Sequence, residues 1–153
     1  MKIRMEIEEN LEEEEIVIRC RSLSNEIVGL QRKIAEAAQT GMQMEVTRGE
    51  RSYFLALDEI LFFETDMSRV AVHTAEQIYE IRMRLYELEE LLPGMFMRIS
   101  KSAIVNVSGI RAIRKNLTGA SEVEFVGTNK KAFVSRNYFK PLMSKLEEKR
   151  LIK

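Results

Sequence analysis

The sequence contains few of the side chains that catalytic and metal sites require. Its 153 residues include one cysteine, Cys20, and one histidine, His73. A single cysteine excludes an internal disulfide, and one cysteine with one histidine cannot form a zinc-binding cluster. The glycines form no phosphate-binding loop, since Gly127-Thr128-Asn129-Lys130 has the composition of a hairpin turn. We therefore predict that the protein is not an enzyme and has no catalytic residue, no metal, no cofactor and no small-molecule substrate.

Long apolar runs and an excess of either charge are also absent. No apolar stretch approaches the roughly 18–20 residues that a membrane span needs. The start, Met1-Lys2-Ile3-Arg4, soon becomes acidic, unlike a secretory signal. These features, with the single cysteine, predict a cytoplasmic protein. Apolar residues make up 45% of the chain and charged residues 31%, which permits a buried core and argues against general disorder.

The charges are unevenly distributed, although their formal sum is zero. Residues 1–96 contain 11 Lys and Arg against 20 Asp and Glu, a balance of −9. Residues 97–153 contain 13 Lys and Arg against 4 Asp and Glu, a balance of +9. Zero net charge counts against a nucleic-acid-binding protein, whereas a basic half indicates a surface for a polyanion. Charge alone leaves chance clustering on a solvated surface as the alternative.

The first 41 residues are predicted to form a strand and then a helix. Lys2–Glu8 alternates polar and apolar residues with the period of a half-buried strand. The acidic run Glu12–Glu15 suits the first turn of a helix. An apolar stripe of amphipathic-helix spacing follows and ends near Ala38, where Thr40-Gly41 closes the helix. The stripe consists of Ile16, Leu23, Ile27, Leu30 and Ile34.

This stripe has two interpretations that the sequence leaves open. It packs on the rest of the chain, or it forms a dimer or partner surface, although fewer than three heptads is short for an independent coiled coil. Cys20 lies near the stripe, and we expect it to be a small buried hydrophobic residue. We take residues 1–41 as an N-terminal strand–helix extension and residues 42–153 as the main domain.

From Gln43 onward the sequence predicts roughly ten short strands and two short helices, separated by turn residues. The fold class is therefore mainly β within an α+β chain. The helices are expected at 85–92 and 138–149, with Pro141 in the first turn of the second. The strands are expected at Met44–Thr47, Tyr53–Leu57, Ile60–Glu64, Val70–Thr74, Ile78–Met83, Phe96–Ile99, Ile104–Val105, Ile110–Arg114, Glu122–Val126 and Lys131–Val134.

Five blocks follow one another in this region: Ile60–Glu64, Arg69–Thr74, the short leucine-rich helix, Phe96–Asn106 and Val134–Tyr138. In this order they resemble the LytTR DNA-binding domain of bacterial transcription regulators, over about residues 43–148. The resemblance implies a LytTR-like stack of small antiparallel sheets with short helices. It also implies that loops at one end of the stack enter successive major grooves of DNA.

The resemblance further implies which residues read bases. They are Ser68, in the loop between two strands, Lys101, in the Arg98–Ser102 loop, and Arg136, after the last strand. Independently of the family, the planar guanidinium of Arg136 matches O6 and N7 of guanine, and the Lys101 ammonium reaches guanine or phosphate.

Other polar residues near these loops suit phosphate, which fixes register rather than sequence. The candidates are Arg69, Arg98, Ser100, Ser102, Asn137 and Lys115. Asn137 lies near the start of a helix whose free N–H groups are expected to point at a phosphate, and Lys130 and Lys131 add to the positive field. Taken one at a time, such loop cations are ordinarily just solvated.

The remaining polar and aromatic residues are interpreted as structural. We expect Phe62, Phe63, Phe96 and Phe125 to be core residues rather than base-stacking platforms, and His73 to be structural. For Asn106, which ends a strand, a turn role is favoured over base contact.

The sequence thus predicts a sequence-specific regulator of transcription that binds double-stranded DNA. The alternative is a β-rich protein-interaction module without specific nucleic-acid binding. A homodimer is expected, and the family resemblance suggests inhibition by a membrane protein. We identify no receiver domain before the DNA-binding part, so the chain is response-regulator-like without a phosphorylation site that we can name.

Overall fold

The computed structural model describes residues 1–12, 14–38 and 42–148. The chain divides into two units, Met1–Ile34 and Ala35–Lys153, which are described separately. The predicted boundary after residue 41 falls outside the described residues and stays a prediction. No helix within the described ranges is long and apolar enough to cross a membrane.

The predicted strand over Lys2–Glu8 is wrong. Described residues before position 25 form no strand, and Ile3, Met5 and Ile7 are each at least 86% exposed. Alternation alone does not make a strand, because a strand needs a neighbour that accepts its backbone hydrogen bonds. No such neighbour is described in this unit.

The helix of this unit begins later than the apolar stripe predicted. Helix α1 spans Asn25–Ala38, and the Ser24 hydroxyl caps it by accepting a hydrogen bond from the Ile27 N–H at 3.3 Å. Ile16 and Leu23 therefore lie outside the helix and are 70% and 79% exposed. The β-branched run 16–18 is a poor helix former, which explains the late start.

Two further expectations for this segment are corrected. Glu12, Glu14 and Glu15 precede α1 instead of forming its first turn, while Glu13 and the predicted closure at Thr40-Gly41 lie outside the described residues. Cys20 is exposed rather than buried, because it belongs to the non-helical stretch before α1.

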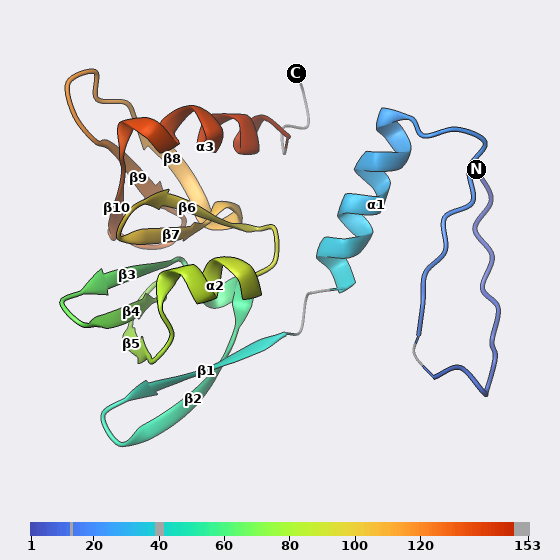
Figure 1. The fold of residues 1–153 in the computed structure, drawn as a ribbon, viewed down its shortest axis with the longest axis horizontal. Coiled ribbons are helices and arrows are strands. Elements are labelled where there is room, and N and C mark those ends of the chain that lie inside the picture. The colour runs from blue at the N-terminus through green and yellow to red at the C-terminus, as the bar shows by residue number, and fades with distance from the viewer. Residues whose placement is uncertain (13, 39–41, 149–153) are drawn as a thin grey trace. The chain divides into compact units, whose positions relative to one another are not determined.

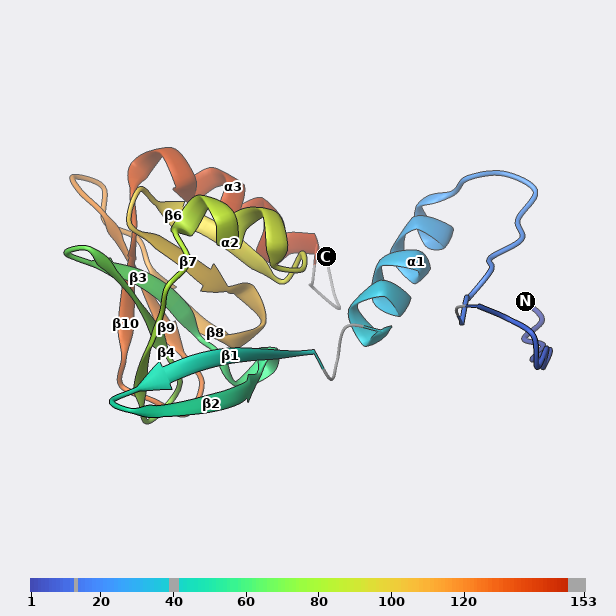
Figure 2. The same ribbon diagram turned by 60° about the horizontal axis from the view of Figure 1, so that its bottom comes forward.

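The second unit confirms the predicted fold class, a mainly β domain with short helices (Figures 1 and 2). Seven antiparallel strands form one sheet in the order β2-β1-β5-β4-β3-β7-β6, and three form another in the order β10-β9-β8. The first sheet consists of β1 (Gln43–Arg48), β2 (Arg51–Ala56), β3 (Phe62–Asp66), β4 (Arg69–His73), β5 (Ile78–Ile81), β6 (Phe96–Ser100) and β7 (Ala103–Asn106). The second consists of β8 (Ile110–Arg114), β9 (Ser121–Phe125) and β10 (Lys131–Val134).

Two helices cover these sheets, and two single 3₁₀ turns interrupt the chain at Leu57–Glu59 and Val107–Gly109. Helix α2 spans Leu85–Leu91, and α3 spans Arg136–Glu148. Since α3 begins two residues before the predicted start, Pro141 lies inside the helix rather than in its first turn. Its missing N–H removes the hydrogen bond that would otherwise go to the carbonyl of residue 137.

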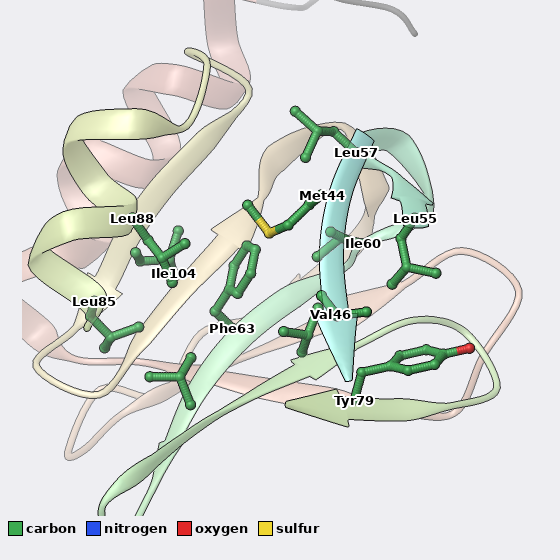
Figure 3. Packing of buried hydrophobic residues seen from close by; sticks show 12 residues of the cluster. Met44, Val46, Leu55, Leu57, Ile60, Phe63, Tyr79, Leu85, Leu88 and Ile104 are labelled. Atoms are coloured by element: carbon green, nitrogen blue, oxygen red, sulfur yellow. The ribbon is translucent and has the colours of Figure 1, made fainter. Parts of the chain in front are cut away.

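The domain contains two apolar cores that share β3 and β7 as a common wall. Phe63 and Ile104 face the first core, which α2 closes with Leu85 and Leu88 (Figure 3). Successive side chains of a strand point to opposite faces, so their neighbours face the second core. That core also contains residues from the three-stranded sheet and from α3. These neighbours are Phe62 and Val105, packed with Val123, Phe125 and Leu142.

The four phenylalanines that were predicted to be core residues do pack in the cores. Phe62, Phe63 and Phe125 are at most 2% exposed, and Phe96 packs against the first core with its ring centroid 5.8 Å from that of Phe63. They are therefore not base-stacking platforms.

Candidate nucleic-acid interface

Strand register places two hairpin turns at the same end of the domain. In β3, Asp66 pairs with Arg69 of β4, and Glu64 pairs with Ala103 of β7. The turn after β3 and the turn before β7 therefore leave the sheet on the same side. The N–H of Thr65 donates to the carbonyl of Ser102 at 2.8 Å, which ties the two turns together.

The start of α3 joins this end of the domain. The Ser135 N–H donates to the Ile99 carbonyl at 3.0 Å, so Arg136 lies beside the end of β6. The Arg136 guanidinium donates to the carbonyl of Thr118, in the connection between β8 and β9. Figures 1 and 2 show this connection on the same side of the domain as the β3–β4 turn. We call this side, formed by residues 66–69, 100–102, 115–120 and 136–137, the loop end.

The three predicted base-reading residues thus come together at the loop end, although they are separated by up to 68 positions, from 68 to 136, in the sequence. Ser68, Lys101 and Arg136 are all exposed. The structure places them as the DNA-reading hypothesis requires, and their roles stay predictions.

The side chain of Arg98 fixes the backbone of the loop that contains Lys101. The guanidinium of Arg98 donates from Nε to the Ser100 carbonyl and from Nη2 to the Lys101 carbonyl, both at 2.6 Å. Its Nη1 lies 3.0 Å from Oε2 of Glu89 in α2. The Arg98 side chain is only 19% exposed. Arg98 therefore builds the loop, a role that sequence analysis missed.

The serines on either side of Lys101 take part in the same turn. The Ser102 N–H donates to the Ser100 hydroxyl at 3.1 Å, and the two hydroxyl oxygens are 3.2 Å apart. Their predicted contact with phosphate stays a prediction, as does that of Arg98. A serine two residues after another is a recognisable signal for such a turn, because its short hydroxyl competes for nearby backbone groups.

The two hairpins border an open hollow of about 800 Å³ that is lined by cationic side chains. Ser68, Arg69 and Lys101 line it, and Arg69 forms an ion pair with Glu80 at 3.0 Å. Because both partners of this pair are at least half exposed, it contributes little to stability. The hollow is far larger than one anion, since a water molecule occupies about 30 Å³ of liquid.

Arg82 and Arg84 also line this hollow, and sequence analysis missed both. They follow β5 and are exposed, whereas Met83 between them is half-buried. Their alternation with apolar residues was interpreted as the continuation of a strand. The signal that could have identified them is their charge, because two arginines lie on the polar side of one short segment. Clustered guanidinium groups favour phosphate oxygens.

A second hollow, of about 390 Å³, lies beside Arg136. Lys115 and Asn137 line it, together with Asn116 and Lys140, which sequence analysis did not single out. The Lys115 ammonium lies 5.3 Å from the centroid of the Phe139 ring, a cation–π distance. Besides Arg136, the lining contains two cations and two amides, which suit an anionic ligand, and the apolar side chains of Leu117 and Phe139.

At the opposite side of the domain, polar side chains hydrogen-bond within the protein. We call this side, formed by residues 73–77, 106–108 and 126–130, the far end. Lys130, expected to add to a general positive field, donates instead to the Gln77 carbonyl at 2.8 Å and lies 3.4 Å from Nδ1 of His73. The Thr128 hydroxyl donates to the Ala75 carbonyl at 2.9 Å. These contacts join the turn between β9 and β10 to the turn between β4 and β5, and so join the two sheets. Lys131 is likewise engaged, with Glu122 at 2.9 Å.

His73 and Asn106 have structural roles at the far end, as predicted. The His73 ring stacks on Phe62 with centroids 4.1 Å apart, and burial, with the nearby Lys130 charge, lowers the pKa of His73 to about 4. Asn106 is 1% exposed; its Nδ2 donates to the Ile60 carbonyl at 2.9 Å, and its Oδ1 accepts from the Ser108 N–H at 3.0 Å. Among the described residues, no group of three or more His, Cys, Asp or Glu could hold a metal ion.

These features define a class: a mainly β domain that exposes basic and polar side chains from several loops at one end. A model of the LytTr DNA-binding domain family matches residues 50–147, more than half of the chain. The chain therefore belongs to the LytTr DNA-binding domain family, as the resemblance implied.

Individual relatives are named as transcriptional regulators. An uncharacterized HTH-type transcriptional regulator of Staphylococcus aureus strain NCTC 8325 / PS 47 is 30% identical over 94 residues, covering 61% of this chain and 63% of that protein. Another, from strain MRSA252, is 39% identical over 54 residues, covering 35% of this chain and 37% of that protein. The chain thus spans less than two thirds of the length of these relatives.

A solved LytTr DNA-binding domain from Bacillus cereus confirms the fold. Its TM-score is 0.63 at 22% identity, with 69% of this chain and 96% of that chain covered. Five strands separate α2 from α3 in the present chain, so these two helices do not form a helix–turn–helix pair.

Proposed function

We propose that this chain is a transcriptional regulator that binds double-stranded DNA sequence-specifically and reads major grooves through its loop end. The observation that carries the proposal is the convergence of Ser68, Lys101 and Arg136, all exposed, from three separate connections. Family membership gives the ligand class, and the cationic hollows beside these residues suit the DNA backbone.

The base contacts are assigned by donor geometry. Arg136 uses one N–H on the Thr118 carbonyl, which fixes the guanidinium and leaves further donors for O6 and N7 of guanine. Lys101 projects from a loop whose backbone Arg98 holds, and it donates to guanine acceptors. Ser68 donates to or accepts from a base edge.

The phosphate contacts are assigned to the cations around these residues. Arg69, Lys115 and Asn137 keep the role that sequence analysis gave them, and Arg82 and Arg84 are added because they line the same hollow as Lys101. Such contacts position the duplex and make binding depend on salt.

The decisive experiment is selection of bound sites from random duplexes, followed by affinity measurements at several salt concentrations. We expect Arg136→Ala to lose about 30-fold in affinity for the selected site, which corresponds to about 2 kcal/mol for one good base contact. Its preference for the base pair that Arg136 contacts should also disappear. Arg111→Ala is the matched control, since Arg111 is an exposed arginine of β8 outside the loop end. Equal binding of selected and competitor DNA by the wild-type protein would refute the proposal.

We further propose that α1 provides the surface of a homodimer. Ile27, Leu30 and Ile34 recur on one side of α1, and none of its residues is buried. A dimer would present two loop ends to repeated half-sites. The same surface would also suit an inhibitory membrane protein. As a DNA-binding regulator, this chain would act in the cytoplasm and would have no enzymatic activity.

The solution mass of the full chain tests the dimer. Leu30→Glu should convert a dimer to a monomer in sedimentation experiments, because a buried unpaired carboxylate is costly in an apolar interface. Gln31→Glu, on an exposed position of the same helix, is the control and should leave the mass unchanged. An unchanged mass for Leu30→Glu would contradict the proposal.

A further inference from the structure

The turn between β3 and β4 contains a methionine in a backbone conformation that favours glycine. Met67 has φ 58°, and the other described residues with positive φ are Gly49 and Gly127, at 64° and 76°. Both glycines also lie in hairpin turns, between β1 and β2 and between β9 and β10. A side chain is strained at such φ values, whereas glycine adopts them freely.

The Met67 side chain gains nothing from packing that would offset this strain. It is 100% exposed, more than any other large apolar residue among those described. Asp66 and Arg69 pair, so Met67 and Ser68 form the whole two-residue loop, and Met67 occupies its first position. Glycine and asparagine are the usual residues in loops of this kind. An observed strained residue at a functional site is grounds for a functional hypothesis.

The chemistry of this turn differs from that of its surroundings. Residues 66–68 contain one carboxylate, one hydroxyl and the apolar Met67, and no cation. Met67 and Ser68 help to line a hollow whose other lining residues include the cations Arg69, Arg82 and Arg84. A duplex held against the loop end would place phosphates on these cations, because the Asp66 carboxylate repels phosphate. The tip of the turn would then face base edges.

We propose that Met67 is a specificity-determining residue that contacts the 5-methyl group of thymine in the major groove. This inference rests on the proposed function. The thymine methyl is the apolar feature of base edges in that groove. The flexible, polarizable thioether of methionine adapts to such a small apolar target. Ser68, next in the chain, then lies within reach of a neighbouring base edge.

The experiment uses the full chain and its selected duplex, in which deoxyuridine replaces thymine at one position at a time. This change removes only the methyl group and retains base pairing. Wild-type protein should lose about fourfold in affinity at the contacted thymine, the effect of one buried methyl-sized group. Met67→Gly should bind the thymine and uracil duplexes equally at that position and keep the wild-type response at every other position.

Two further variants separate this role from general effects. Met67→Leu should retain discrimination against uracil, because it remains apolar. Leu117→Ala removes another exposed apolar residue of the loop end and should leave the response at the Met67 position unchanged. Met67→Gly relieves the backbone strain, so it should unfold at the same temperature as wild type or above.

The outcomes distinguish this inference from the proposed function. Specific binding with a uracil response that is identical in wild type and Met67→Gly would overturn the role of Met67 and leave the regulator proposal intact. Specific binding by a wild-type protein that is indifferent to every uracil would do the same. Wild-type protein without preference for any duplex would overturn both.

Discussion

The two ends of the β domain use their polar side chains in opposite ways. At the far end, Thr128 and Lys130 donate to carbonyls in the turn between β4 and β5, and Asn106 is buried with both amide atoms bonded. At the loop end, hydrogen bonds such as those of Arg98 hold the loops in place, while the side chains of Ser68 and Arg136 remain exposed. The far end thus stabilises the fold, and the loop end presents side chains to a ligand. Changes at the far end should alter stability without altering DNA preference, and changes at the loop end should do the reverse.

Acidification should produce the largest effect, at the far end. The pKa of His73 is lowered to about 4, from 6.5 in an unfolded chain, by burial and by the Lys130 charge. Between these pH values the unfolded chain binds a proton that the folded protein does not. The free energy of unfolding should therefore fall as pH falls, by about 3 kcal/mol at pH 4, and be unaffected by His73 above about pH 7. Urea unfolding measured from pH 7 to 4 checks this.

His73→Phe is the control for that prediction. Phenylalanine can still stack on Phe62 but does not titrate, so the variant should be less sensitive to acid than wild type. The comparison removes the contribution of carboxylates, including Glu64, whose Oε2 lies 3.8 Å from Nε2 of His73. Equal acid sensitivity of the two proteins would contradict the assignment.

Asn106→Ala should have the next largest effect, also at the far end. It removes hydrogen bonds to the Ile60 carbonyl and the Ser108 N–H in a buried site, which should cost about 2 kcal/mol of stability. Urea unfolding measures the loss, with Asn129→Ala as an exposed control that should change stability by less than about 0.5 kcal/mol. At temperatures where the variant is folded, its preference among duplexes should match wild type. A changed preference would break the distinction between the ends.

Arg98→Ala should have the smallest of these effects on free energy, and it should appear in DNA binding. Loss of the three contacts that hold the loop should reduce affinity for the selected site about tenfold, or about 1.4 kcal/mol. Discrimination at the base that Lys101 contacts should weaken, while the dependence of affinity on salt should not change. Glu89→Ala removes no positive charge and should shift affinity in the same direction by a smaller factor, since it acts through Arg98.

The salt dependence decides between two roles for Arg98. A direct phosphate contact contributes about 0.9 to the slope of log affinity against log salt. A slope reduced by that amount in Arg98→Ala, with discrimination intact, would support phosphate contact and contradict the positioning role.

Local sequence patterns predicted the strands of the second unit because each has at least one face that must be buried. The same pattern failed at Lys2–Glu8, since periodicity describes a surface and does not provide the partner strand that pairs with it. Similarly, the stripe from Ile16 to Ile34 has helical spacing throughout, but the Ser24 cap and the β-branched residues before it decide where α1 begins.

Local sequence patterns predicted less of the candidate site than of the fold. The convergence of Ser68, Lys101 and Arg136 follows from the order in which strands pair, and only the family resemblance anticipated it. Arg98 occupies a polar position of β6 and looked suited to phosphate, yet it shares a strand face with Phe96, and Glu89 of α2 meets it there. The positive φ of Met67 could not be predicted from the sequence, because the turn at residues 67–68 lacks the glycine or asparagine that usually marks such a turn.

The wall that β3 and β7 form between two cores has a consequence for how this family member can vary. All four residues of β7 are buried, with Ile104 and Val105 facing different cores. Inserting or deleting one residue there would exchange the two faces, whereas a change of two would restore the original facing. Lys101 and Ser102 lie immediately before this strand. Since the register of β7 can change only by whole residues, the distance of these two residues from the sheet can also change only by whole residues. Adaptation to a new DNA site is therefore expected through substitutions in the loops, with strand lengths held constant.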